Sequence, residues 1–280
     1  MYNGYKVVVA TPAGRQRFLE ILLRHSLCNR DVIDRHDLWL NTTVPSDIDF
    51  IHRAARAYPD YFNIVHPIEP LANRPVESIA QFYRNCIDED TIYIKLDDDV
   101  CYICPDALRH LVEFRVAHPE AFLIYPIVIC TGMEWVLDVF RPVARWKRSF
   151  KNCNLEHIRR HVEFLSDPTA DRYLCEPYLI PSDLSISINC ISWMGKDFAS
   201  FGGNVPAWPV YDEDWLTLTK TKEMGRPNYI NGSSVMVHFS YTHGGTMKFL
   251  EDFTDLRQRY LELALEICPK LLPAQIKFFV

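Results

Sequence analysis

No stretch of this 280-residue chain holds the run of about 18 apolar residues that a membrane-spanning helix requires. Internal repeats and low-complexity segments are also missing, which argues against repeat and disordered classes. Residues Met1–Tyr5 lead directly into an apolar run without the pattern of a signal peptide, so we expect a cytoplasmic protein. Basic residues are not in excess. The formal net charge is −6, which argues against nucleic acid as the main partner.

Cysteine is present, but in no pattern that indicates a disulfide framework. The nine cysteines are odd in number and scattered, and without an export signal they are most simply reduced thiols. Cys101 and Cys104 form a single C-x-x-C, which supports a zinc site only weakly because no second pair accompanies it. We therefore expect buried free thiols.

The composition is that of a globular protein. It is 48% hydrophobic and 13% aromatic, enough to bury a substantial core. Short apolar runs alternate with segments of helical period, with strands expected over 6–10, 38–40, 63–66 and 91–96 and helices over 17–28, 45–58 and 78–86. This alternation predicts an α/β fold with a parallel, doubly wound sheet and right-handed crossovers.

The second half of the chain is less regular. Residues 131–181 are polar and rich in arginine, histidine and aromatic residues, and we interpret them as insertions that cover the sheet and meet an acceptor. The elements expected around them are a helix over 105–117, an apolar run over 121–130, strands over 184–193, 229–230 and 235–239, and an amphipathic C-terminal helix over 249–268.

The most informative stretch is TIYIKLDDDV, residues 91–100. Its first six residues have the character of a buried strand, and Asp97, Asp98 and Asp99 follow directly. Three adjacent carboxylates beside a core are unfavourable unless a hard divalent cation neutralises them, and oxygen ligands suit Mg²⁺ or Mn²⁺. Alternate strand residues share a face, so we expect Asp97 and Asp99 to point together. Ligands of open α/β sheets bind at the carboxyl ends of strands, which favours a site over a solvated acidic turn.

Two later features bear on the same site. Asp212, Glu213 and Asp214, followed by a tryptophan, open a predicted helix. Acidic residues favour a helix N-terminus, which accounts for one or two of the three. His238 lies in the last predicted strand, where a lone histidine is either a satisfied core residue or a ligand, and the nearby His243 is its rival.

In their order along the chain, the sheet, the D-x-D, the D-E-D-W and the late histidine resemble the GT-A-fold glycosyltransferases that use nucleotide-sugar donors. Within that family the chain looks like the xylosyltransferases of large algal viruses, the chloroviruses, which build a capsid glycan. The resemblance implies a GT-A (Rossmann-like) open mixed sheet, mostly parallel and flanked by helices. It also implies one domain over 1–280, with a nucleotide-sugar-binding half (1–105) and an acceptor-binding half (106–280). In a viral setting, the cytoplasm would be that of the host.

The resemblance further implies roles for single residues. Asp97, Asp99 and His238 would hold Mn²⁺ or Mg²⁺, which neutralises the departing diphosphate of a UDP-sugar as a Lewis acid. Asp97 would also reach the donor ribose, and Asp98 the donor sugar. Asn41 stands where family members often have an aspartate that binds the nucleotide base of the donor. The remaining nucleotide-sugar contacts would be Thr11, Pro12, Asn41, Arg74 and Arg84. Apart from the resemblance, we expect Lys248 to pair with the diphosphate.

An acceptor hydroxyl is a poor nucleophile, so a single displacement benefits from a carboxylate base. By the family motif this base is Asp214, with Glu213 second and Asp212 third, and the motif favours inversion at the anomeric carbon. The viral resemblance implies transfer of xylose from UDP-xylose to a fucose of a capsid N-glycan, on an oligosaccharide or glycoprotein acceptor. Two alternatives stay open. One is a sugar nucleotidyltransferase, whose glycine-rich first loop is weak here, and the other is a non-catalytic carbohydrate-binding protein.

Overall fold

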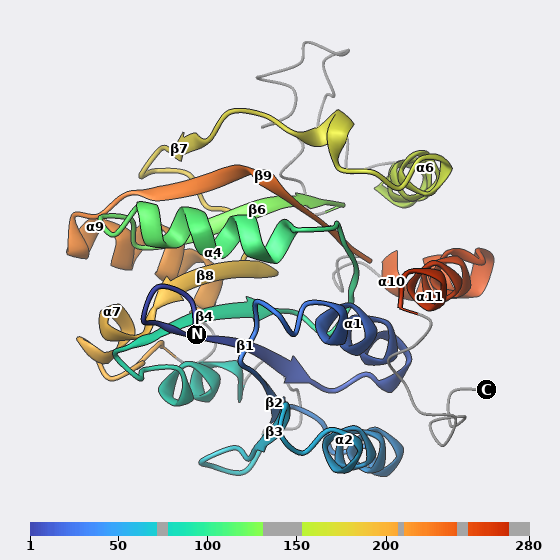
Figure 1. The fold of residues 1–280 in the computed structure, drawn as a ribbon, viewed down its shortest axis with the longest axis horizontal. Helices are drawn as coiled ribbons and strands as arrows, with labels where there is room; N and C mark the ends of the chain where they lie inside the picture. The colour runs from blue at the N-terminus through green and yellow to red at the C-terminus, as the bar shows by residue number, and fades with distance from the viewer. Residues whose placement is uncertain (72–77, 131–152, 207–209, 240–245, 269–280) are drawn as a thin grey trace.

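The computed structural model describes residues 1–71, 78–130, 153–206, 210–239 and 246–268 (Figure 1). They form a nine-stranded open sheet in the order β3-β2-β1-β4-β8-β6-β9-β5, with β7 also paired to β9. The strands are β1 (Lys6–Ala13), β2 (Arg35–Leu40), β3 (Phe62–Val65), β4 (Thr91–Leu96), β5 (Val100–Ile103), β6 (Ile124–Ile129), β7 (Tyr178–Ile180), β8 (Cys190–Met194) and β9 (Asn228–His238). Most of the paired strand residues lie in parallel ladders, so the predicted α/β fold with a mixed, mostly parallel sheet is confirmed.

Helices flank this sheet. Figure 1 shows α1 and α2 beside the N-terminal strands, α4 across β6, and α10 and α11 together at one end of the sheet. The longer helices are α1 (Gln16–Cys28), α2 (Pro45–Ala57), α4 (Ala107–Ala117), α6 (Cys153–Ser166), α10 (Thr246–Phe253) and α11 (Leu256–Ile267). The shorter ones are η1 (Ile79–Asn85), η3 (Asp171–Tyr173), α7 (Gly195–Ala199), α8 (Asp212–Asp214), η4 (Trp215–Lys220) and α9 (Thr221–Met224). No helix in the described part of the chain is both long and apolar enough to cross a membrane.

The strands β1 to β4 form the parallel half of the sheet. β4 is buried along its whole length, and strands covered on both faces have nearly continuous apolar sequences. β1 continues to Ala13, past the expected end at Ala10, although Pro12 cannot donate a ladder hydrogen bond. The proline is tolerated there because β4 pairs with β1 only as far as Ala10.

Two antiparallel pairings set up the site. β8 lies beside β4, with Cys190 opposite Leu96. β5 lies beside β9, with Val100 opposite His238. The residues after β4, before β8 and at the end of β9 therefore meet at one edge of the sheet.

The strand β9 corrects one expectation, since the sequence predicted separate strands over 229–230 and 235–239. The polar residues 231–234 interrupt the apolar pattern, but the chain stays extended through them as one strand, and of these four only Asn231 has a partner in β6. A register shift between Pro126 and Ile127 of β6 accommodates these residues.

The C-terminal segment also departs from expectation, because it forms α10 and α11 rather than a single helix over 249–268. Thr254 separates them. Its hydroxyl donates to the carbonyl of Leu250 and accepts from the backbone N–H of Leu256 at 3.4 Å. Such side-chain bonds to the backbone compete with helix continuation.

A disulfide between Cys28 and Cys268 corrects the expectation that every cysteine is reduced. Cys28 is the last residue of α1, and Cys268 directly follows α11. Because these two helices pack together, the Cα atoms of the two cysteines are 6.2 Å apart, within the range that a disulfide spans. A separation of 240 residues gives no signal in the sequence. Cys86, Cys101, Cys104 and Cys190 are buried reduced thiols, as predicted.

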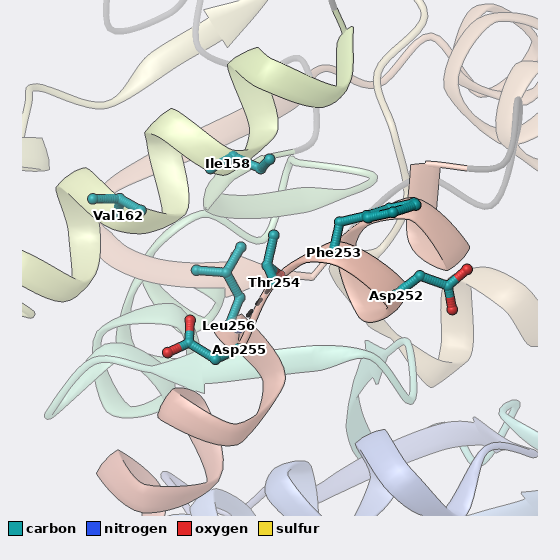
Figure 2. Close-up of a pocket in the computed structure, with 7 residues that line it drawn as sticks. All are labelled: Ile158, Val162, Asp252, Phe253, Thr254, Asp255 and Leu256. Carbon is teal, nitrogen blue, oxygen red and sulfur yellow. Dashed lines mark hydrogen bonds between the residues drawn. The ribbon is translucent and has the colours of Figure 1, made fainter.

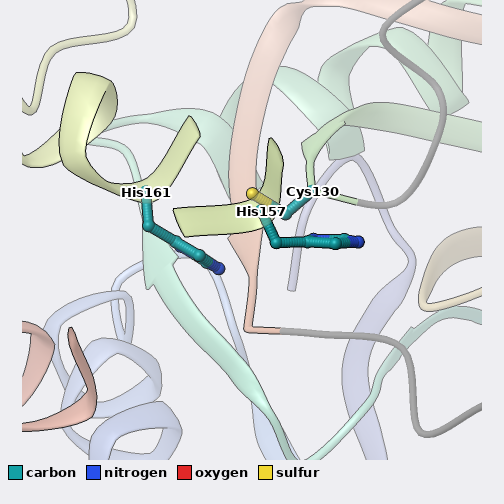
Figure 3. Close-up of side chains that lie close together, drawn as sticks. All are labelled: Cys130, His157 and His161. Carbon is teal, nitrogen blue, oxygen red and sulfur yellow. The ribbon is translucent and has the colours of Figure 1, made fainter. Parts of the chain in front are cut away.

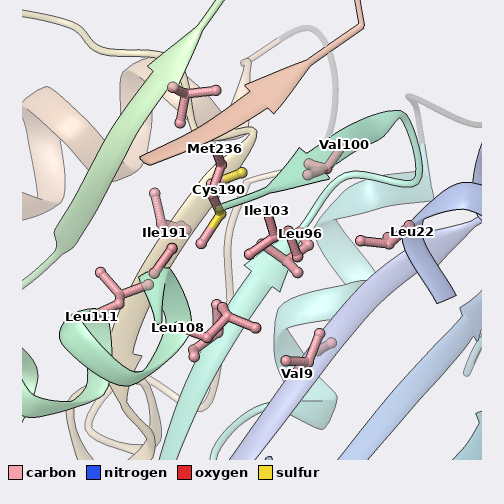
Figure 4. Close-up of a cluster of buried hydrophobic side chains, with 14 of the residues drawn as sticks. Val9, Leu22, Leu96, Val100, Ile103, Leu108, Leu111, Cys190, Ile191 and Met236 are labelled. Atoms are coloured by element: carbon pink, nitrogen blue, oxygen red, sulfur yellow. The ribbon is translucent and has the colours of Figure 1, made fainter. Parts of the chain in front are cut away.

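The core lies next to Asp97, Asp98 and Asp99, the three aspartates after β4 that we call the acidic corner. Figure 4 shows apolar side chains from β1, β4, β5, α1, α4, β8 and β9 packed together, among them Val9, Leu22, Leu96, Leu108 and Ile191. Leu96 is fully buried and is followed directly by Asp97. The carboxylates that follow β4 thus lie at the boundary between a dense core and solvent.

Candidate functional site

Asp97, Asp99 and His238 come together at the edge of the sheet defined above. One carboxylate oxygen of each aspartate and one ring nitrogen of His238 lie within 4.8 Å of one another. His238 Nε2 is 3.0 Å from Asp99 Oδ1, and the backbone N–H of Phe239 donates to the carbonyl of Asp99 at 2.9 Å. Asp97 is half-buried whereas the other two are buried, so the cluster is reached from the side of Asp97.

The buried carboxylate of Asp99 is kept ionised by its neighbours. Burial by itself raises the pKa of Asp99, but His238 and the Arg15 guanidinium, 3.0 Å from Oδ1, outweigh burial and lower this pKa well below its usual range. Two carboxylates and an imidazole are a donor set that suits Mn²⁺ or Mg²⁺. The residues present therefore fit a hard divalent cation.

Asp98 points to the other side, toward the loop between β1 and α1. Its Oδ2 accepts hydrogen bonds from the backbone N–H groups of Gly14 at 3.0 Å and Arg15 at 2.8 Å, and its Oδ1 accepts from Arg15 Nε at 2.9 Å. Burial raises the pKa of Asp98 against the opposing effect of Arg15. In this structure Asp98 positions the loop, and its carboxylate does not join the Asp97–Asp99–His238 cluster.

Sequence reasoning missed Lys95 and Asn189, which hold Asp97. Lys95 is buried and pairs with Asp97, and its Nζ also donates to the carbonyl of Ile188 at 2.9 Å. Although burial lowers the pKa of Lys95, Asp97 and Asp212 outweigh it and raise this pKa. Asn189 Nδ2 donates to Asp97 Oδ2 at 3.0 Å and is 3.1 Å from His238 Nε2. A lone lysine within an apolar strand, two residues before Asp97, was the available signal.

We expect the Lys95→Met variant to be less stable than the wild type by about 3 kcal/mol, because Asp97 and Asp212 lose their common countercharge. Urea denaturation followed by circular dichroism measures this difference. Lys196→Met is the control, since Lys196 is exposed. Equal free energies of unfolding for the two variants would contradict the role given to Lys95.

The acidic segment 212–214 faces the same corner. Asp212 Oδ2 accepts from the Tyr83 hydroxyl at 2.7 Å, and burial raises the pKa of Asp212. Burial also raises the pKa of Glu213, despite hydrogen bonds from Ser187 and the backbone of Ile188.

Asp214 differs from both of these acids, because its side chain is exposed. Its Oδ1 accepts a hydrogen bond from the Ser185 hydroxyl at 2.6 Å.

Residues 185–189 connect the aspartates that follow β4 with the acidic segment 212–214. The buried residues Ile186, Ile188 and Cys190 alternate with half-buried polar residues that carry the contacts. Ser185 binds Asp214, Ser187 binds Glu213 and Asn189 binds Asp97. Alternate residues of an extended chain share a face, so residues 185–189 align both acidic groups along one surface.

The other predicted nucleotide contacts are dispersed. Thr11 is fully buried, with its hydroxyl 2.9 Å from His36 Nε2, and Pro12 is buried beside it. Asn41 is half-buried and follows β2. Its backbone N–H donates to the carbonyl of Ala13 at 2.9 Å.

The predicted basic contacts are also spread out. Arg84 pairs with Glu69 at 3.2 Å and Lys248 with Asp252 at 2.5 Å. Arg74 and His243 lie outside the described residues.

A hollow of about 600 Å³ lies between α6 and the turn that joins α10 to α11 (Figure 2). Ile158 and Val162 of α6 line one side, and the turn between α10 and α11, residues 252–256, lines the other. None of the site residues named above contributes to it, so it does not mark the acidic site.

No protein-family model and no curated protein matches the chain. A solved mycobacterial protein is similar in fold, with a TM-score of 0.51, 13% identity, and coverage of 96% of this chain and 76% of that one. Glucosyl-3-phosphoglycerate synthase from Mycobacterium tuberculosis has a TM-score of 0.49, 15% identity and coverage of 96% and 81%. 4-Diphosphocytidyl-2C-methyl-D-erythritol synthase from Anaerococcus prevotii has a TM-score of 0.47, 12% identity and coverage of 90% and 99%. At these identities the similarity concerns the fold alone.

Proposed function

We propose that this protein is a metal-dependent, inverting glycosyltransferase that moves a sugar from a nucleoside diphosphate to a hydroxyl group of a glycan. The observation that carries the proposal is the convergence of Asp97, Asp99 and His238 from distant parts of the chain. A donor set of this kind beside a second group of carboxylates supports both halves of a sugar transfer, departure of the diphosphate and activation of the acceptor.

Asp97, Asp99 and His238 would hold Mn²⁺ or Mg²⁺, which supplies charge to neutralise the leaving diphosphate. Asn189 orients this site, because its amide contacts both Asp97 and His238. Arg15 and Lys95 add positive charge on either side of the aspartates. These contacts hold Asp97 and Asp99 in place before the ion binds.

Asp214 is the proposed base. A base has to reach the hydroxyl of the acceptor before its pKa matters, and Asp214 is exposed with a single hydrogen bond from Ser185. Glu213 is held by Ser187 and the backbone of Ile188, so we assign it a positioning role.

The finer identity of the substrates rests on the sequence resemblance to the chlorovirus enzymes. On that basis we propose UDP-xylose as donor, a fucose-containing glycan as acceptor and the cytoplasm as location. Thr11, Pro12, Asn41, Arg74, Arg84, Asp97, Asp98 and Lys248 remain the proposed donor contacts.

One observation favours a sugar nucleotidyltransferase as the second candidate. The guanidinium of Arg15, in the loop after β1, contacts both Asp98 and Asp99, so a cation of the first loop lies beside the aspartates. The two reactions differ in their products. Sugar transfer releases UDP, whereas nucleotidyl transfer to a sugar phosphate releases pyrophosphate.

We expect a UDP-sugar to raise the melting temperature only when Mn²⁺ or Mg²⁺ is present, because the ion joins the diphosphate to the aspartates. At a hundred times its dissociation constant a ligand stabilises by about 2.7 kcal/mol, which a thermal-shift screen detects readily. UDP released with acceptor and metal supports the proposal. Release of pyrophosphate from nucleoside triphosphate and sugar phosphate would favour the second candidate. If neither UDP nor pyrophosphate is released, both candidate functions are rejected.

A further inference from the structure

A second group of metal-binding side chains lies against the residue that follows His238. Cys130 follows β6, and His157 and His161 lie one turn apart on α6 (Figure 3). The sulfur of Cys130 and one nitrogen of each ring lie within 4.8 Å of one another. All three side chains are buried, with exposed fractions of at most 6%.

We propose that Cys130, His157 and His161 bind Zn²⁺ and thereby fasten α6 to the sheet. A thiolate and two imidazoles are the ligands that zinc prefers, whereas Mg²⁺ and Mn²⁺ prefer the oxygens of the acidic site. Histidines four residues apart on a helix share a face, as they do in known zinc motifs. Binding releases the thiol proton of Cys130 to solvent.

The surroundings of His161 match those of a zinc ligand. Its Nε2 lies 2.6 Å from the carbonyl oxygen of Phe239, and because a carbonyl only accepts, Nε2 carries the proton. Metal-binding histidines usually donate their other N–H in this way, which fixes the tautomer. Nδ1 therefore holds the lone pair and lies 2.9 Å from the hydroxyl of Tyr260. The Tyr260 hydroxyl donates to this lone pair when no metal is bound, and when Nδ1 binds zinc the hydroxyl can turn its proton to the sulfur of Cys101.

The backbone at Cys130 gives independent support. Its φ is +67°, in the left-handed region that residues other than glycine and asparagine rarely adopt. In this conformation the thiol of Cys130 lies beside the two imidazole rings (Figure 3). Such backbone outliers concentrate at ligand sites, where the side chain has a task that a glycine could not perform.

The site would act on the acidic corner through the backbone. His161 donates to the carbonyl of Phe239, and the N–H of Phe239 donates to the carbonyl of Asp99. Fixing α6 therefore fixes the end of β9 next to His238. The two sites share no ligand, so a result that rejects zinc binding leaves the proposed sugar transfer unaffected, and the reverse also holds.

The test uses the full chain, stripped with a chelator and titrated with ZnCl₂ or CoCl₂ alone. We expect stoichiometric zinc by mass spectrometry after gel filtration, and with cobalt the thiolate-to-metal charge-transfer band of a cysteine ligand. Cys130→Ser loses this band, and His157→Gln weakens zinc binding by about 10-fold or more.

Two controls separate this site from other metal binding. Cys175→Ser removes a thiol outside the cluster, and Asp97→Asn disables the acidic site, so both retain the cobalt band. No charge-transfer band in the wild type overturns the proposal, even if the Cys130 variant does not fold. The same band in a folded Cys130→Ser protein also overturns it.

Discussion

The Asp99→Asn variant is expected to lose metal-dependent sugar transfer by about 1000-fold or more. Asp99 lies between His238 and Arg15, and its carboxylate is the most buried oxygen donor of the proposed cation site. Without this charge the ion is bound weakly and the leaving diphosphate is not neutralised, which raises the activation barrier by about 4 kcal/mol. Initial rates of UDP release across a range of Mn²⁺ concentrations measure the effect.

The control for Asp99 is Asp90→Asn, an exposed aspartate just before β4 that should keep wild-type activity. His238→Ala provides a second variant should Asp99→Asn be too unstable to purify, and it is expected to need far more Mn²⁺ for any turnover. Metal-dependent turnover that persists unchanged in folded Asp99→Asn protein would refute the cation site.

The second large effect is expected at Asp214. Its replacement by asparagine removes the proposed base, which lowers kcat by about 10² to 10⁴ and leaves the affinity for donor and metal nearly intact. A thermal shift with UDP and Mn²⁺ reports that affinity, while UDP release with acceptor present reports the rate. The separation of rate from donor binding is what distinguishes a base from a residue of the donor site.

Glu213→Gln is the matched comparison for Asp214→Asn. Glu213 is held by Ser187 and Ile188, so we expect a smaller loss of rate from a shift of α8. Asp183→Asn, an exposed acid outside the site, should behave as the wild type. A larger loss in Glu213→Gln than in Asp214→Asn would show that the base has been assigned to the wrong acid.

The sequence predicted the parts of the fold that local patterns encode. Continuous apolar runs marked the buried parallel strands, because both faces of the sheet are covered. The sequence did not reveal β5, a four-residue strand whose existence depends on pairing with β9. It also placed one helix at the C-terminus, where Thr254 divides two.

By itself the sequence determined that the chain is a globular α/β protein and that three carboxylates follow a central strand, because strand and helix periods and local charge are properties of adjacent residues. Only the tertiary structure decided which distant groups meet those carboxylates. His238 comes to Asp99 through the register of β5 and β9, and Asn189 comes to Asp97 through that of β4 and β8. The same holds for the disulfide and for the cysteine and histidines of the second site. Contacts between residues far apart in the chain depend on strand pairing and helix packing, and no local pattern records them.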